Sequence, residues 1–126
     1  MTHGSRPKAW GVGSPAILHL HHFGEVVRDA FGVTPVLVGS ATIDKRVTPR
    51  DIDVRLVLTD ADFIARIGPL VECGKPFTCW AALSMAFSAL GKEMTGLPVD
   101  FQIQPESHAM RYNGCACIEL GREVQS

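Results

Sequence analysis

The sequence has few cysteines and no long apolar run, and each shortage excludes a class of protein. Its 126 residues contain four cysteines (Cys73, Cys79, Cys115 and Cys117), too few for a small scaffold held together by disulfides. The most apolar stretch, residues 80–90, includes two serines and is much shorter than the roughly 20 residues that cross a bilayer. The N-terminus lacks the pattern of a secretory signal. We therefore expect a cytoplasmic protein with reduced thiols and no membrane partner.

No charge of either sign is in large excess. Twelve Lys and Arg residues face 13 Asp and Glu residues, which gives a formal net charge of -1. This balance argues against a protein that holds long nucleic acid on a broad basic face, although it leaves room for a local basic patch. With 46% hydrophobic and 20% charged residues, the composition is that of a globular protein, and the length fits one domain. We expect a single domain over residues 1–126, with residues 1–13 as a loose arm.

The apolar residues alternate between two periodicities along the chain. Helical spacing, with proline or threonine before it and glycine after it, predicts helices over 16–31, 63–67 and 79–94. Short runs rich in β-branched and apolar residues predict strands over 35–38, 52–58 and 99–104. The tail beyond residue 105 contains Asn113-Gly114 and could add a hairpin or an edge strand.

Carboxylates lie on two of the expected strands. Asp51 and Asp53 are two residues apart, so on an extended chain both side chains point to one face. Asp100 lies between Val99 and Phe101, on the polar side of the third strand. If these strands pair, three like charges converge. Such a group is costly unless a cation lies between its members, and a divalent metal ion is a common solution.

A simpler interpretation of an acidic pair is a strand end that meets solvent. Asp60 and Asp62 have the same spacing as Asp51 and Asp53, but they follow the last apolar residue of their strand, where helix capping explains them. Capping does not explain Asp51 and Asp53, because the apolar strand continues beyond them.

Gly39-Ser40 follows the first expected strand. A glycine lets a ligand approach the backbone, and the next amide and hydroxyl can donate to phosphate oxygens, although Gly-Ser is also a common turn. Three basic residues of the following loop could meet a triphosphate or simply be solvated. They are Lys45, Arg46 and Arg50.

Taken in order, three motifs resemble those of the DNA polymerase β-type nucleotidyltransferase superfamily, in its minimal single-domain form. They are Val38-Gly39-Ser40, Asp51-Ile52-Asp53-Val54 and Val99-Asp100-Phe101. The resemblance implies an α/β (α+β) fold with a small, mixed, twisted sheet and helices packed on one side. It also implies transfer of a nucleoside monophosphate from a nucleoside triphosphate to an acceptor hydroxyl, with release of pyrophosphate.

The same resemblance assigns roles to individual residues. Asp51, Asp53 and Asp100 would bind two Mg²⁺ ions, and Asp100 would also help to deprotonate the acceptor. Gly39 and Ser40 would hold the triphosphate.

This chain departs from the family pattern at two positions. Ala41 stands where relatives often have a larger or basic residue, so binding of the triphosphate would rest more on Lys45, Arg46 or Arg50. Arg55 falls on the face of Asp51 and Asp53. It could bind phosphate, or it could neutralise the carboxylates, and the second role would weaken the case for catalysis.

Other residues that could suggest a site have simpler interpretations. His19 and His22 share a helical face without a carboxylate between them and are expected to be exposed. Cys115 and Cys117 lack a second pair at zinc spacing and are expected to be small strand residues, and Trp80 and Phe87 are expected in the core.

Two functions remain open on this basis. The first is a nucleotidyltransferase, and its acceptor could be a protein, an RNA or a small molecule. The alternative is a non-catalytic nucleotide- or partner-binding module, such as the small subunit of a two-protein toxin–antitoxin-type system with a helical partner protein.

Overall fold

A computed structural model describes residues 15–39, 52–109 and 118–121. Its α-helices are α1 (Ala16–Phe31), α2 (Asp60–Arg66) and α3 (Cys79–Thr95), and a short 3-10 helix η3 spans Leu70–Glu72. Its strands are β1 (Val36–Val38), β2 (Ile52–Leu58), β3 (Val99–Pro105) and β4 (Ile118–Glu119). The expected loose arm over residues 1–13 lies outside the described residues. No helix in the described ranges is both long and apolar enough to cross a membrane.

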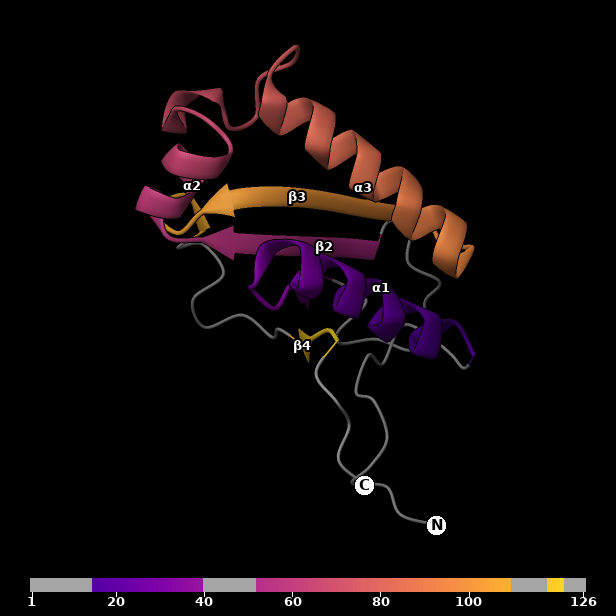
Figure 1. Ribbon diagram of the computed structural model, residues 1–126. Coiled ribbons are helices and arrows are strands. Elements are labelled where there is room, and N and C mark those ends of the chain that lie inside the picture. The colour runs from indigo at the N-terminus through magenta and orange to yellow at the C-terminus, as the bar shows by residue number, and fades with distance from the viewer. Residues whose placement is uncertain (1–14, 40–51, 110–117, 122–126) are drawn as a thin grey trace.

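The four strands form one mixed sheet in the order β3-β2-β1-β4. β1 pairs antiparallel with both β2 and β4, whereas β2 and β3 run parallel. The crossover between β2 and β3 contains α2, η3 and α3, and α3 packs on β3 and on α1 (Figure 1). This arrangement confirms the predicted fold class, a small mixed sheet with helices on one side.

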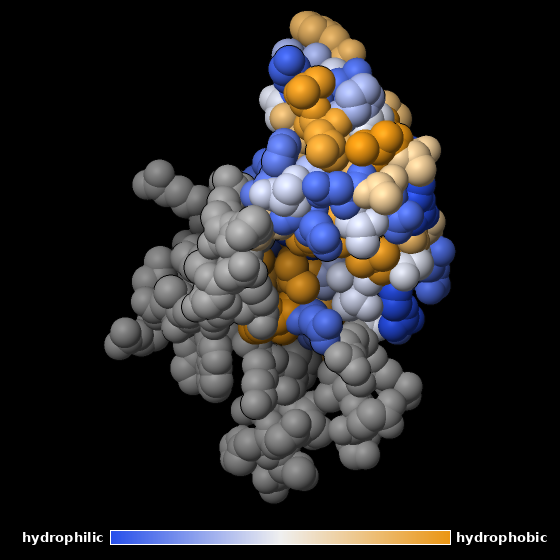
Figure 2. Space-filling view, turned by 90° about the vertical axis from the view of Figure 1, so that its left-hand side faces the viewer, coloured by the Kyte–Doolittle hydropathy of each residue, from blue (hydrophilic) through white to orange (hydrophobic). Residues whose placement is uncertain are grey.

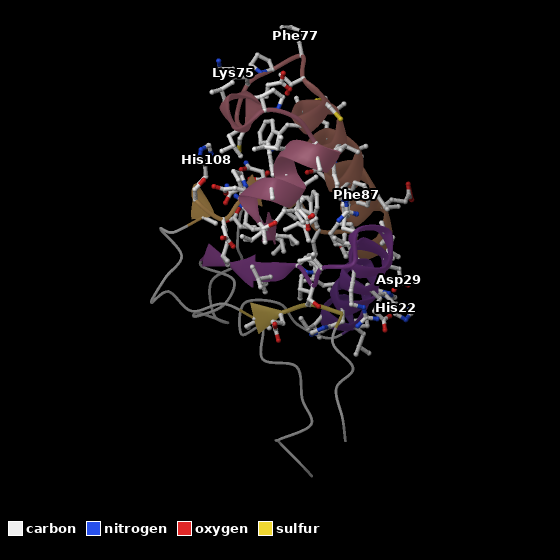
Figure 3. The ribbon with its side chains drawn as sticks, turned by 60° about the vertical axis from the view of Figure 1, so that its left-hand side comes forward. His22, Asp29, Lys75, Phe77, Phe87 and His108 are labelled. Atoms are coloured by element: carbon white, nitrogen blue, oxygen red, sulfur yellow. The ribbon has the colours of Figure 1, made fainter. Side chains whose placement is uncertain are left out.

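Burial of the alternating strand residues holds the helices to the sheet. Phe101 of β3 is fully buried and contacts Phe23 of α1, with their ring centroids 6.0 Å apart in an edge-to-face arrangement. Phe87 of α3 is partly buried against the core, and its ring centroid lies 5.3 Å from that of Phe101 and 5.4 Å from that of Phe31; Figure 3 labels it. Full burial of a side chain such as Phe23 or Phe101 contributes about 1.5–3 kcal/mol. The expected core position of Phe87 is therefore confirmed.

The predicted helices and strands are present with small shifts at their ends. α2 starts at Asp60, earlier than the predicted residue 63, because Thr59 accepts a hydrogen bond from the amide of Asp62 and thereby caps the helix. β1 starts at Val36, one residue later than predicted. Leu90 is an apolar residue within the predicted helix 79–94, yet it is 37% exposed.

The outer side of β3 is closed by side chains of α3. Ser88 Oγ accepts a hydrogen bond from the amide of Phe101 at 2.8 Å and donates to the carbonyl of the same residue at 3.3 Å. The indole nitrogen of Trp80 donates to the carbonyl of Ile103 at 2.5 Å. Side chains of α3 thus satisfy backbone groups of β3 that would otherwise be available to a further strand.

The segment 118–121 lies at the opposite edge of the sheet and packs on α1. β4 pairs with β1, which fits the expectation of an edge strand in the tail. The Arg28 side chain donates to the carbonyl of Gly121 at 2.6 Å, and the Gly121 amide donates to Nδ1 of His21 at 3.2 Å. These contacts join residues more than ninety positions apart.

Candidate functional site

Two of the predicted carboxylates are neighbours on the sheet. In the parallel pairing of β2 with β3, Asp53 is the direct partner of Asp100. The residues that follow them, Val54 and Phe101, are fully buried, so the aspartates lie on the opposite face of the sheet, where their side chains are 31% and 40% exposed. Like charges are therefore held side by side on a partly solvated face.

Gly39 lies against one of these carboxylates. Its φ of +81° is in the left-handed region, where glycine is favoured. A Cβ atom at this position would be 2.7 Å from Oδ2 of Asp53, too close for any ordinary contact. The end of β1 and the Asp53 side chain can therefore approach as they do because residue 39 has no side chain.

Arg55 brings a positive charge to the two carboxylates. Its side chain is 8% exposed, and Nη2 lies 3.6 Å from Oδ1 of Asp53 and 3.4 Å from Oδ2 of Asp100. Nη1 donates to the carbonyl of Asp100 at 2.7 Å and to that of Val54 at 3.1 Å. Of the two roles considered for Arg55, these contacts favour neutralisation of the carboxylates. Two carboxylates beside one guanidinium still leave a formal charge of -1 among these three groups.

The remaining predicted site residues cannot be placed relative to this cluster. Asp51, Ser40, Lys45, Arg46 and Arg50 all lie outside the described residues. Within the described ranges, no three acidic, histidine or cysteine side chains come together as metal ligands. The structure thus brings together Gly39, Asp53 and Asp100 and leaves the other predicted members of the site untested.

His19, His22 and Trp80 lie where the sequence predicts them, the histidines on the surface and the tryptophan against the core. His19 and His22 are exposed on α1. Trp80 is half-buried and packs on the core. Cys73 is half-buried and Cys79 is exposed, whereas Cys115 and Cys117 lie outside the described residues.

A cavity of about 520 Å³ adjoins Asp100 on the side away from Asp53, between β3 and α3. Asp100 and Gln102 contribute its wall on the strand, and Trp80, Ser84 and Met85 line it from the helix. The Ser84 side chain is buried, and its hydroxyl has no hydrogen-bond partner among the described residues. The cavity thus combines apolar walls with polar groups that can form further hydrogen bonds.

This cavity was not among the features predicted from the sequence. One signal for it is present, because Trp80, Ser84 and Ser88 recur every four residues and so lie on one face of the helix. Two serines on the buried side of an apolar helix need partners, and the structure supplies them for Ser88 alone.

Apolar side chains are also exposed around α2 and the connector before α3. Ile64, Val71 and Phe77 are 54%, 69% and 101% exposed. Figure 2 shows apolar surface gathered on the upper part of the face at that end of the molecule, and Figure 3 shows Phe77 at the far tip of the connector.

Comparisons with known proteins identify no relative. No protein-family profile matches the chain, and no match was found among curated proteins or solved structures.

Proposed function

We propose that this protein is a Mg²⁺-dependent nucleotidyltransferase that acts in the cytoplasm. The observation that carries the proposal is the direct pairing of Asp53 with Asp100, with Gly39 packed against the Asp53 carboxylate. Two carboxylates paired across β2 and β3, beside the glycine that follows β1, suit a bound cation and a phosphate group that the cation holds.

The donor atoms fit the metal that the resemblance implies. Mg²⁺ prefers carboxylate oxygens, and the Asp53 and Asp100 carboxylates are paired across β2 and β3. Asp53 and Asp100 would bind the ions together with Asp51, which the family pattern adds. Bound there, Mg²⁺ would stabilise the negative charge that develops on the phosphate oxygens.

The protein groups would then position the reactants. An acceptor hydroxyl beside Asp100 would pass its proton to the carboxylate as its oxygen attacks the α-phosphorus, and the bond to the β-phosphate oxygen would break to release pyrophosphate. Gly39 would let the triphosphate approach the backbone, since it has no side chain. Ser40, Lys45, Arg46 and Arg50 complete the phosphate-binding set in this proposal.

Calorimetric titration with each of the four nucleoside triphosphates tests binding. We expect at least one to bind in 5 mM Mg²⁺ and to bind much more weakly in EDTA. Asp53→Asn should weaken the Mg²⁺-dependent binding at least tenfold. The matched control is Asp29→Asn, which alters a carboxylate that is 78% exposed on α1, and it should bind as the parent does.

Transfer is tested with α-labelled triphosphate and a cell extract that supplies acceptors. We expect Asp100→Asn to reduce labelling by about 10²- to 10⁴-fold, the usual contribution of a general base, while triphosphate binding largely persists. An unchanged melting temperature excludes damage to the fold. Labelling at the parental rate by Asp100→Asn would show that Asp100 takes no part in the reaction.

Two observations favour the alternative, a non-catalytic nucleotide- or partner-binding module. Arg55 already lies within 3.6 Å of both carboxylates, so the site is partly neutralised by the protein itself. The exposed Ile64, Val71 and Phe77 would suit a helical partner protein that buries apolar surface. Under this alternative the protein binds a triphosphate or a partner, and no labelled product forms.

A further inference from the structure

The cavity beside Asp100 has the size and lining of a small-molecule site. Its volume of about 520 Å³ lies within the range of 300–1,000 Å³ typical of ligand pockets. Trp80 and Met85 give it apolar walls, and the hydrogen bond from the Trp80 indole to Ile103 fixes the position of that ring. The Trp80 wall is thus pre-formed, whereas Met85 is 72% exposed and can close over an occupant.

Ser84 provides an independent indication of a ligand. Its side chain is 6% exposed and lines the cavity, yet its hydroxyl lacks a partner in the part of the chain that the structure describes. A buried hydroxyl without a hydrogen bond costs about 1–3 kcal/mol. Rotation about the Cα–Cβ bond gives this hydroxyl three staggered positions from which to reach an occupant.

Two further side chains of the cavity can form hydrogen bonds: Asp100 as an acceptor and Gln102 as a donor. The Asp100 carboxylate accepts hydrogen bonds, so it suits hydroxyl groups of an occupant. The Gln102 carbonyl accepts a hydrogen bond from Gln104 at 3.3 Å, and its amide nitrogen is a donor on a residue that lines the cavity. The occupant should therefore carry both hydroxyls and acceptor atoms.

The charges around the cavity favour an uncharged occupant. The Arg55 guanidinium lies 3.4 Å from Asp100 and offsets its charge. Among the described residues that line the cavity, the one ammonium is that of Lys75, which is exposed, and phosphate groups are usually bound by several charged donors. An uncharged molecule with a flat ring system and hydroxyl substituents meets both the apolar and the polar requirements.

We propose that this cavity binds a small, uncharged, hydroxyl-bearing heteroaromatic molecule, of which a ribonucleoside is the simplest example. Its ring system packs between Trp80 and Met85, its hydroxyls donate to Asp100, and Ser84 and Gln102 bond its polar atoms. Binding of this molecule does not depend on the proposed enzymatic function. The further step, that this occupant presents the acceptor hydroxyl to Asp100, rests on the proposed function.

The test uses adenosine, guanosine, cytidine and uridine as probes, without metal or triphosphate. Each is titrated into the ¹⁵N-labelled full-length protein, and the indole signal of Trp80 and the amide signal of Ser84 are followed. We expect saturable shifts of both signals with at least one nucleoside. Its 2′,3′-dideoxy counterpart should bind at least tenfold more weakly, and its 5′-monophosphate no more tightly.

Two alanines of α3 provide matched variants. Ala81 lines the cavity, whereas its neighbour Ala82 is exposed outside it. Ala81→Leu should fill part of the space and weaken nucleoside binding at least tenfold, and Ala82→Leu should leave the affinity unchanged. Both variants should melt cooperatively, which shows that they fold.

The outcomes distinguish this proposal from the proposed function. Absence of saturable shifts with all four nucleosides, or equal losses in the two leucine variants, would overturn the cavity assignment even if nucleotide transfer is observed. Nucleoside binding that depends on Ala81, in a protein that transfers no labelled nucleotide, would confirm the site and contradict the enzymatic role.

Discussion

Nη2 of Arg55 lies 3.4 Å from Oδ2 of Asp100, and Nη1 of the same guanidinium donates to the main-chain carbonyl of Asp100 at 2.7 Å. One side chain of β2 therefore contacts both the carboxylate and the backbone of a residue on β3. Arg55 thus links the two strands and balances their charges at the same point. Any cation that binds the aspartates has to share them with this guanidinium.

Arg55→Met should make the carboxylates dependent on an added cation. We expect the variant to lose about 2 kcal/mol of unfolding free energy, less than for a fully buried pair because both aspartates are partly exposed. Addition of 10 mM Mg²⁺ should raise its melting temperature more than that of the parent, as measured by calorimetry. NaCl of equal ionic strength is the control. An identical Mg²⁺ response in variant and parent would contradict a cation site here.

Gly39→Ala should lower the free energy of unfolding more than Gly32→Ala does. Gly32 is the matched control, because its φ of +75° is similar and a Cβ atom there would have no neighbour within 4 Å. Both changes should cost about 1–2 kcal/mol for the left-handed backbone. Gly39→Ala should cost a further 1 kcal/mol or so from its contact with Asp53.

Urea unfolding measures this difference. The additional loss should disappear when both alanine variants are made in an Asp53→Ala background. If it persists there, contact with the carboxylate is not its cause.

Ser84→Ala and Ser88→Ala should change stability in opposite directions, although the residues are one turn apart on α3. Ser84 has no partner in the described structure, so its removal should raise the free energy of unfolding by about 1 kcal/mol. Ser88 makes two hydrogen bonds to Phe101, so its removal should lower it by about 1–3 kcal/mol. Guanidinium titration compares the variants, and a similar loss in both would show that the Ser84 hydroxyl is satisfied.

His21 should make stability dependent on pH. Burial lowers the pKa of His21 below its ordinary value, and the charge of Glu25 opposes this shift only in part. The folded protein therefore binds fewer protons than the unfolded chain, so the free energy of unfolding should fall as pH drops through about 6.5 and through the lower folded-state pKa. The loss should level off below that pKa.

Protonation would also remove the acceptor for the Gly121 amide. In urea unfolding at pH 5.0 and 7.5, His21→Asn should show a smaller change than the parent, since an amide oxygen can accept that hydrogen bond at either pH. His22→Asn, at the exposed neighbouring position, is the matched control. An unchanged pH response in His21→Asn would assign the effect to other groups.

The placement of the helices, the strands and their buried faces could be predicted from the sequence because it depends on local spacing. Alternation over residues 99–104 placed Asp100 on the polar face, and the structure bears this out. The pairing of Asp53 with Asp100 depends on a parallel register that no local pattern specifies. Whether Arg55 binds phosphate or neutralises the carboxylates likewise depends on its contacts with Asp100 of β3, which no local pattern gives.

The cavity could not be predicted for a related reason. It exists because α3 lies along the outer edge of β3 at a distance set by Trp80 and Ser88, and a sequence pattern gives the face of a helix without giving its distance from a strand. The absence of a partner for Ser84 is visible only once that distance is known.

The hydrogen bonds from α3 to β3 also bear on self-association. An exposed strand edge is a template on which a second molecule can add a strand, and this is a common route to aggregation. In β3 the carbonyls of Phe101 and Ile103 and the amide of Phe101 are already bonded to serine and tryptophan side chains. A strand from another molecule would have to displace a packed helix to reach them, so this stretch of the edge is protected in the folded protein at high concentration.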